Sequence, residues 1–510
     1  MKRLLSISLV LTLAMIILAG CGGKKETPTA ASGSAVEYRD TLNVVFEAEP
    51  STLFPNDTSE IWGATIMRLI YNTIIYRTND DKQEFCSEIA KSWEYLNDTT
   101  IRFHLNDNIY WSNGEKLTAD DVQFSMTIAN ANPKVHYYGQ LEKVEIVDPL
   151  TVDVYTKGPN AALLSNFTQA RSSIINKKRY EEVGMAAYGR NPLGTGPYVM
   201  ESWKAGESIV LKARNDYWNG KGATPTIICR FVTESANRSV EMETGQADLI
   251  TNPDFNDLDR LADLGFNVVS NVSYLISQVS INNKGVPDIK IRQALAYAID
   301  YQSLVDAVYG KMATVADGLV PNLMTGYLKN WDVKYDPAKA RQLISESRTP
   351  NGLTLEVMTT NLTENLQLAE ILQYYWRQVG ITVNVTQAAQ AQIRERSDSG
   401  NYQVYPNFSN WATGDPSRAL SGFSGARPET YNLPDNVTKE LADIWNQALA
   451  EIDPVKRVEV YRLLQEKIKE QWVFFPLAHK KLAYVINKNV VDFYPSPTGS
   501  PELMMVRVKK

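Results

Sequence analysis

The clearest structural signal in the chain is the stretch at residues 353–385, LTLEVMTTNLTENLQLAEILQYYWRQVGITVNV. Apolar and polar residues alternate over 353–357, which is the period of a β-strand. Apolar residues then recur at helical spacing as far as Gly380, a residue typical of the position just past a helix end. Residues 381–385 alternate again. The stretch therefore predicts a strand–helix–strand unit, whose crossover is nearly always right-handed.

Segments on either side extend this unit into a mixed α/β protein. Asp336-Pro337 and Asp453-Pro454 each place a capping carboxylate before a proline, which predicts a helix start. A mixed helical pattern covers residues 61–75. The predicted strands of the first third of the chain are 41–46, 99–105, 141–146 and 151–155. A body of about 470 residues is too long for one core and predicts at least two lobes.

The first 21 residues indicate export from the cytoplasm. Lys2 and Arg3 precede an apolar run of about 16 residues, which is short of the roughly 20 that a membrane-spanning helix needs. The sequence Leu18-Ala19-Gly20-Cys21 resembles the bacterial lipobox; the alternative is a chance cysteine near an ordinary cleavage site. We expect residues 1–20 to be a signal peptide and Cys21 to carry the lipid.

Residues 21–37 are rich in Gly, Lys, Thr, Ala and Ser, so they predict a flexible tether that cannot bury enough surface to order itself. We therefore expect the protein outside the cytoplasm, on the cell surface or in the periplasm, held to the cell membrane by its N-terminal lipid. No later run of about 18 apolar residues predicts a membrane span.

Composition and spacing argue against several kinds of chemistry. The chain has 52 basic and 58 acidic residues; without Lys2 and Arg3 the balance is 50 minus 58, a net charge of −8. This acidity argues against a nucleic-acid partner. Three dispersed histidines and the spacing of Cys86 and Cys229 predict no metal site and no cofactor. We expect both cysteines to be buried small apolar residues, and a disulfide between them stays open.

Four segments together resemble the family 5 substrate-binding proteins of ABC importers. This group contains oligopeptide-, dipeptide-, glutathione- and nickel-binding proteins. The segments are IYWSNGEKLTADDVQFSM at 109–126, NPLGTGPY at 191–198, a helix pair at 291–321, and the closing helices and strand at 435–476. Their combination in this order is specific, whereas each segment by itself is a weak signal. Asp120, Asp121 and the glycine-rich loop are interpreted as architecture, because they suit a helix start and a turn.

The resemblance implies an α/β, two-lobed clamshell of the type II kind with an extra inserted subdomain. The hinge is expected at two crossings, near Ser280–Lys284 and near Pro476–Lys480. The expected parts are lobe one at 38–62, 190–283 and 478–510, the inserted subdomain at 63–189, and lobe two at 284–477.

The resemblance also implies a monomeric, non-enzymatic protein that binds a small solute and delivers it to the permease subunits of an ABC importer. A short peptide is the first choice of ligand. A nickel chelate, an opine, glutathione or an oligosaccharide are alternatives. Two functions of another class stay open: a secreted hydrolase, and a surface adhesin or signal-peptide receptor.

The resemblance places the ligand loop at residues 410–419, NWATGDPSRA. Trp411 would supply an aromatic wall, with Thr413 and Gly414 beside it. Peptide binders of the family carry an aspartate three residues after this tryptophan, where the present chain has Gly414. Asp415 either takes over the pairing with a ligand amine or is simply a helix N-cap before Pro416.

A buried arginine is the usual partner of a ligand carboxylate. Arg171 and Arg427 are the candidates, and Asn432 is a weaker candidate for a ligand contact. The alternative for each arginine is a solvated position on the surface.

Overall fold

The computed structural model describes residues 36–57, 60–78, 84–132, 141–350 and 353–510. The predicted signal peptide, Cys21 and most of the predicted tether lie outside the described residues. The chain divides after Val36, and the fold below is that of Glu37–Lys510. Among the residues that the structure describes, no helix combines the length and apolar character needed to cross a membrane.

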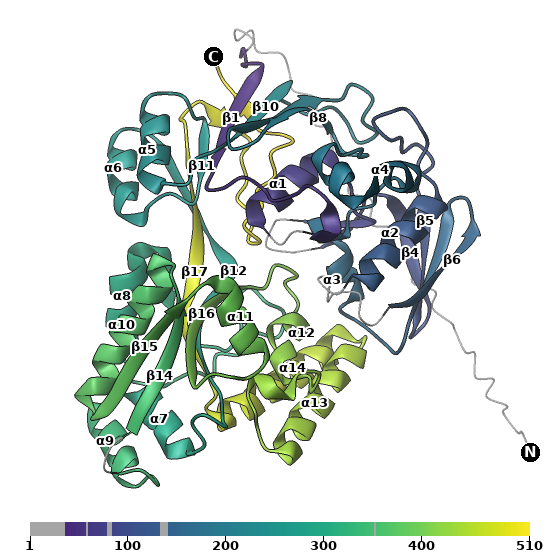
Figure 1. Ribbon diagram of the computed structural model, residues 1–510. Helices are drawn as coiled ribbons and strands as arrows, with labels where there is room; N and C mark the ends of the chain where they lie inside the picture. Colours follow the sequence, from purple (N-terminus) through teal and green to yellow (C-terminus); the bar gives the residue numbers. More distant parts are fainter. Residues whose placement is uncertain (1–35, 58–59, 79–83, 133–140, 351–352) are drawn as a thin grey trace, which may run out of the picture. The chain divides into compact units, whose positions relative to one another are not determined.

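Among the described residues one large sheet has eleven strands and continues through both lobes (Figure 1). The strands lie in the order β15-β14-β16-β12-β17-β11-β1-β10-β9-β8, and β13 pairs with β17. Their bounds are β1 Thr41–Phe46, β8 Tyr198–Lys204, β9 Ser208–Ala213, β10 Thr226–Phe231, β11 Leu249–Thr251, β12 Asn267–Ile281, β13 Ala313–Val315, β14 Leu353–Thr360, β15 Ile381–Ala388, β16 Val404–Asn410 and β17 Phe474–Ile486.

The antiparallel pair β12 and β17 connects the lobes, and Figure 1 shows the yellow β17 running from one into the other. Residues 267–272 of β12 pair with the end of β17 that also pairs with β11. Residues 276–280 of β12 pair with the beginning of β17, and this half of β12 also pairs with β16. The register breaks between Val272 and Ile276. The passage between the lobes thus lies before Ser280–Lys284, the first crossing expected from the sequence.

Each lobe has its own apolar core. The core of lobe one includes Leu42 and Val44 of β1, and the core of lobe two includes Leu355 of β14 and Trp376 of α10. Strands β14 and β15 are parallel and joined by α10, so the predicted strand–helix–strand unit is confirmed. The helices are α1 Ile61–Ile70, α2 Ala119–Ala131, α3 Leu163–Phe167, α4 Lys177–Arg190, α5 Ser235–Glu243, α6 Leu258–Asp263, α7 Ile289–Tyr297, α8 Tyr301–Tyr309, α9 Pro337–Ser345, α10 Thr363–Gln378, α11 Gln390–Asp398, α12 Pro416–Ala419, α13 Asp435–Ala450 and α14 Pro454–Gln471.

A separate four-stranded antiparallel sheet, in the order β4-β5-β7-β6, packs against α2 around a third core. The strand predictions at 99–105 and 151–155 are confirmed. The helical pattern predicted for 61–75 ends earlier, at Ile70, because Tyr71 is extended and Thr73 turns its backbone N–H to Glu88. The remaining strands are β2 Ile75–Arg77, β3 Phe85–Ser87, β4 Ala90–Asn97, β5 Thr100–Leu105, β6 Leu141–Asp148, β7 Thr151–Thr156, β18 Val490–Val491 and β19 Arg507–Val508.

The two cysteines differ in burial. Cys229 lies buried on β10, as the sequence predicted, and its thiol has a pKa raised to about 12 by burial. Cys86 lies on β3 and is partly exposed, so the prediction that it is buried was wrong. The short strand that carries Cys86 pairs on one side with β2, and its side chains lie near the rim of the third core.

The glycine-rich loop at 194–196 fixes the end of α1. The backbone N–H of Gly196 donates to the Ile70 carbonyl at 2.8 Å. A Cβ atom on Gly194 would overlap that carbonyl, and a Cβ on Gly196 would lie 2.5 Å from its carbon. Glycine is required here because the two backbones approach too closely for any side chain.

We expect Gly194→Ala to lower the free energy of unfolding by about 1–3 kcal/mol, because the added methyl must displace the end of α1. Urea denaturation measures this change. Gly158→Ala is the matched control, because a Cβ atom added to Gly158 would meet nothing within 4 Å. Equal stability of the two variants would contradict the role given to Gly194.

Candidate functional site

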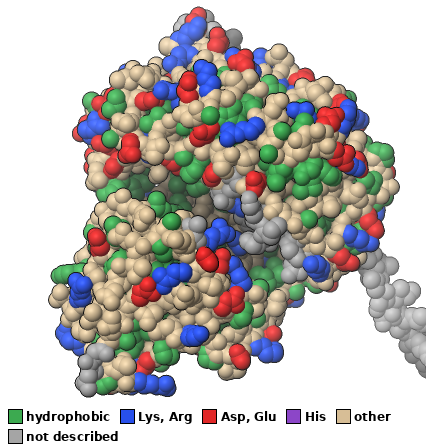
Figure 2. Space-filling model, in the orientation of Figure 1, with side chains coloured by type: hydrophobic (Ala, Val, Ile, Leu, Met, Phe, Trp, Pro, Cys, Tyr) green, Lys and Arg blue, Asp and Glu red, His purple; other side chains and the backbone are tan. Residues whose placement is uncertain are grey.

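A cavity of about 550 Å³ lies between the two lobes, where Figure 2 shows the surface hollowed. One wall comes from α1, the turn at 169–171 and the segment at 498–500. The other comes from the starts of α10 and α11, from β16 and from Ala412. The lining combines apolar surface with amides, hydroxyls and charges. Its aromatic members are Trp62, Tyr405 and Phe408, and its amides are Gln169, Asn365, Gln390, Asn407 and Asn410.

Three buried polar atoms of this lining have no hydrogen-bond partner among the described residues. They are the Nε1 donor of Trp62 and the Oδ1 acceptors of Asn365 and Asn410. The other end of each amide is engaged, since Asn365 Nδ2 donates to Thr360 Oγ1 at 2.7 Å and Asn410 Nδ2 to the Thr498 carbonyl at 3.0 Å. Folded proteins rarely leave buried polar atoms without partners. These three atoms have almost no exposed surface, so the polar character of the wall comes from the other amides, hydroxyls and charges of the lining.

The cavity also has charged side chains on the lobe-one side. Arg171 and Arg68 line it together with one acid, Glu60. Arg68 Nη2 donates to the Thr168 carbonyl at 3.0 Å, and Glu60 accepts from the Ser51 backbone N–H at 3.0 Å. On the opposite wall burial raises the pKa of Tyr405, so its phenol is neutral at physiological pH and can donate a hydrogen bond. Arginines in such a wall suit a ligand carboxylate.

The loop predicted to hold the ligand lies at the edge of this cavity. Trp411 is partly buried against the lobe-two core, and its neighbours Asn410 and Ala412 line the cavity. The Thr413 carbonyl accepts from Arg77 Nη1 of β2 at 2.7 Å. Gly414 has a φ of 64°, and a Cβ there would lie 2.8 Å from Arg77 Nη1. Thr413 and Gly414 therefore also contact β2.

Asp415 is held inside lobe two. Its side chain caps α12 by accepting from the Ser417 N–H at 2.9 Å, and it forms a two-point ion pair with Arg457 at 2.8 and 3.0 Å. Tyr461 adds a hydroxyl at 3.3 Å. Burial alone would raise the pKa of Asp415, but Arg457 and these donors hold it below its usual value. Its charge is thus already balanced within the protein.

Breaking this pair should be costly. We expect Asp415→Asn to lower the free energy of unfolding by about 3–5 kcal/mol, because Arg457 stays buried without a counter-charge. Asp443→Asn is the control, since its pair with Lys439 is exposed and should contribute at most about 1 kcal/mol. Urea denaturation of both variants measures the difference, and equal losses would contradict the assignment.

The ion pair between Asp415 and Arg457 also makes the free energy of unfolding depend on pH. Because the pKa of Asp415 is lower in the folded state, its contribution is present above the unfolded value near 3.8 and is lost as pH falls through the folded value. The Asp415→Asn variant should therefore lose less stability than the wild type on acidification.

The other two predicted contacts lie away from the cavity lining. Arg427 is exposed and pairs with Asp398 of α11 at 2.9 Å. Asn432 has a φ of 47° and donates from Nδ2 to the Glu429 carbonyl at 2.9 Å. The turn from 427 to 432 therefore packs on its own lobe, and Arg171 is the predicted carboxylate partner that lines the cavity.

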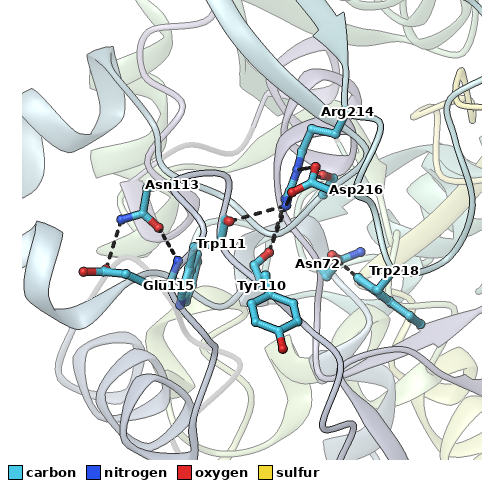
Figure 3. A network of polar contacts seen from close by, with 9 residues as sticks. Asn72, Tyr110, Trp111, Asn113, Glu115, Arg214, Asp216 and Trp218 are labelled. Atoms are coloured by element: carbon cyan, nitrogen blue, oxygen red, sulfur yellow. Dashed lines mark hydrogen bonds and ion pairs between the residues drawn. The ribbon is translucent and has the colours of Figure 1, made fainter.

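The segment at 109–126 has a structural role. Figure 3 shows Arg214, whose guanidinium pairs with Asp216 at 3.0 Å and donates to the Tyr110 and Trp111 carbonyls at 3.2 and 3.4 Å. Asp121 forms a capping box with Thr118 at the start of α2. These contacts fix the turn and the helix, in agreement with the interpretation of this segment as architecture.

The family model of the bacterial extracellular solute-binding proteins, family 5 (middle region), matches residues 84–431, which are 348 of the 510 residues. The chain belongs to this family. Family 5 proteins bind solutes outside the cytoplasm and deliver them to ABC importers; they are transport proteins and not enzymes. The family assignment made from sequence segments is confirmed.

Similar proteins cover nearly the whole chain. The glutathione-binding protein GsiB of Salmonella paratyphi A is 26% identical over 467 residues, which are 88% of this chain and 90% of that protein. NikA from Brucella suis, in complex with Fe(III)-EDTA, has a TM-score of 0.83 at 21% identity and covers 92% of this chain and 100% of its own. DppA from Helicobacter pylori, in complex with the peptide STSA, has a TM-score of 0.78 at 22% identity over 93% and 99%. These structures confirm the two-lobed α/β fold of this family 5 protein.

Sequence reasoning missed most of the cavity wall of this family 5 protein. Trp62 and Arg68 lie on α1, for which the sequence predicted only a helical pattern, and Asn407 lies on β16 before the predicted ligand loop at 410–419. Asn407 within a predominantly apolar part of this strand was a usable signal, because a buried amide needs partners. The start of α10 was interpreted only as part of the strand–helix–strand unit, so Asn365 was missed.

Proposed function

We propose that the solute of this binding protein is a short peptide held in the cavity between the lobes. The observation that carries this proposal is the lining of this cavity, which combines several amide side chains with Arg171, Glu60 and aromatic rings. A peptide backbone alternates carbonyl acceptors with N–H donors, so it can pair with amide side chains, which both donate and accept hydrogen bonds. A polar lining of this kind favours such a ligand over a purely apolar one.

Arg171 is the residue proposed to receive the peptide carboxylate. It lines the cavity on the lobe-one side, where its guanidinium can form a two-point contact with a carboxylate. Trp411, Thr413 and Gly414 are proposed to frame the edge of the site. Asp415 is a poor partner for a ligand amine, because Arg457 already balances its charge. Among the described residues, Glu60 lines the cavity and is proposed as the candidate for an amine because of its position there.

Glutathione is the second candidate, favoured by the 26% identity with glutathione-binding proteins. It is itself a small peptide with carboxylates, so the same wall could hold it. Opines and metal chelates, which bind solved relatives of similar fold, and oligosaccharides complete the set to be screened. Titration calorimetry with tripeptides, glutathione, an opine, a nickel–histidine chelate and an oligosaccharide distinguishes these classes. Binding of the sugar or chelate alone would refute the peptide proposal.

Arg171→Met should weaken binding of a tripeptide by about 2–5 kcal/mol, because the ligand carboxylate loses its buried counter-charge. The methionine keeps much of the side-chain length and packing. Arg427→Met is the control, because Arg427 pairs with Asp398 on the surface and should not change the dissociation constant. Calorimetric titration measures both variants. Equal affinity of Arg171→Met and the wild type would remove Arg171 from the site.

We also propose that Cys21 is lipidated and that the segment at 21–37 tethers the binding unit to the membrane. The support is the lipobox-like sequence at the end of an apolar run that is too short to span a bilayer.

Cys21→Ala should release the protein from membranes in cell fractionation, because a protein without the lipid has no anchor of this kind. Cys86→Ala is the control, since Cys86 lies on β3 within the folded unit and should leave membrane retention unchanged. Retention of Cys21→Ala at wild-type levels would contradict the anchor.

A further inference from the structure

Two large apolar side chains of lobe two are exposed where they line the cavity between the lobes. Phe408 of β16 is 37% exposed, and Leu362, the residue before α10, is 52% exposed. Single exposed apolar side chains are common on protein surfaces and need no explanation. These two lie on the wall of one cavity, so a molecule bound there can shield them from water.

Lys480 of β17 links the parts of the chain that carry these two side chains. Its ammonium group lies 4.6 Å from the centroid of the Phe408 ring, within the range of a cation–π interaction. The same group donates to both carboxylate oxygens of Glu364 at 2.7 Å. Glu364 lies in the first turn of α10, two residues after Leu362. Lys480 thus contacts the ring of Phe408 directly and the start of α10 through Glu364.

The ion pair of Lys480 and Glu364 is partly shielded from water. The side chain of Lys480 is 14% exposed, and that of Glu364 is 29% exposed. Glu364 lies at the N-terminus of α10, where the helix dipole also favours a carboxylate. Partly buried charges are screened less than fully exposed ones. The ion pair therefore restrains the ammonium group of Lys480, which lies against the ring of Phe408.

A tyrosine of α8 also contacts Lys480. The ammonium group lies 5.1 Å from the centroid of the Tyr309 ring, and Tyr309 donates its hydroxyl to Ser277 Oγ at 2.8 Å. Ser277 of β12 is the register partner of Phe408 on β16. Residues directly opposite each other on neighbouring strands place their side chains on the same face of the sheet. The position of Phe408 therefore depends on residues of β12 and β17, the two strands that connect the lobes.

We propose that Phe408 and Leu362 form an apolar subsite for one side chain of the solute, and that Lys480 is the positioning residue that holds this subsite in place. The inference rests on the proposed binding of a peptide between the lobes, and it names the class of side chain that this site prefers. An apolar side chain that covers the subsite removes apolar surface from water on both partners, whereas a polar side chain of the same size loses its own hydration. The protein then prefers solutes with one large apolar side chain.

The test uses leucine and asparagine, whose side chains are similar in size and differ in polarity. Three pairs of tripeptides are compared by titration calorimetry: Leu-Ala-Ala with Asn-Ala-Ala, Ala-Leu-Ala with Ala-Asn-Ala, and Ala-Ala-Leu with Ala-Ala-Asn. We expect the wild type to bind the leucine peptide of one pair about tenfold more tightly than its asparagine counterpart, the order of magnitude for one apolar side chain that leaves water. Phe408→Ala should reduce this ratio towards one, and so should Leu362→Asn at the more exposed position.

The role of Lys480 is tested with two variants. Lys480→Met keeps much of the side-chain length but removes the charge, so it should lower the leucine-to-asparagine ratio, because Phe408 and the start of α10 lose their common contact. Lys480→Arg should retain most of the preference, since arginine also pairs with carboxylates and stacks on aromatic rings. A purely structural role of Lys480 would lower the melting temperature of Lys480→Met and leave the ratio unchanged, which would overturn its positioning role.

Two control variants match these changes in lobe two. Tyr374→Ala removes an exposed ring of α10 that does not line the cavity. Lys467→Met removes the ion pair with Glu440 that joins α14 to α13. Both controls should keep the full ratio of affinities, because neither change touches Phe408, Leu362 or Lys480.

Failure of the apolar subsite and failure of the peptide function give different results. Equal binding of the leucine and asparagine peptides in all three pairs would overturn the subsite and support peptide binding. If no peptide binds, the peptide function is refuted, and a leucine-derived and an asparagine-derived opine are compared in the same way. A preference for the leucine opine that Phe408→Ala abolishes would support the subsite, and no such preference would overturn it.

Discussion

The pairing of β12 with β17 is the interaction on which the rest of the structure depends. These two strands are the ones along which hydrogen bonding continues from the lobe-one strand β11 to the lobe-two strand β16. At the break in their register lies Tyr274, whose N–H donates to the Pro497 carbonyl and whose carbonyl accepts from the Trp411 N–H. One irregular residue therefore sets the positions of the loop after β16 and of the segment at 497–500. Both line or border the cavity between the lobes.

Away from this pair, the lobes meet through polar contacts. Arg77 donates to the Thr413 carbonyl at 2.7 Å, Gln169 to the Ala412 carbonyl at 3.2 Å, and the Ala161 N–H to the Leu449 carbonyl at 2.9 Å. Hydrogen bonds of this kind each contribute only about 1 kcal/mol net. A solute that contacts both walls can therefore shift the balance between open and closed arrangements, provided it binds one of them better.

Acidic residues that look alike in the sequence have different roles in the folded protein. Asp415 has a dedicated buried partner in Arg457, so its charge is used within lobe two. Asp443 pairs with Lys439 on the exposed face of α13. The burial and the partner of each carboxylate depend on which helices and strands meet.

The sequence by itself was enough to predict the family, and to predict those helices and strands whose apolar residues repeat at a clear period. The strand–helix–strand unit at 353–385 could be predicted because alternation and helical spacing report burial of one face of each element directly. The capping signals before Pro337 and Pro454 were local too, and both helices begin there. Arg171 could be named as a cavity residue, but from the resemblance and not from its own surroundings.

Only the tertiary structure decided which polar residues line the cavity between the lobes. Trp62, Asn365 and Asn410 lie more than 40 residues apart along the chain, and they line one cavity only because α1, α10 and β16 converge. Arg457, the partner of Asp415, is 42 positions away along the chain. The ion pair between them gives the Asp415 carboxylate a structural role inside lobe two. Periodicity reports which face of an element is buried. It carries no information about what that face meets, because long-range contacts depend on the packing of separate elements.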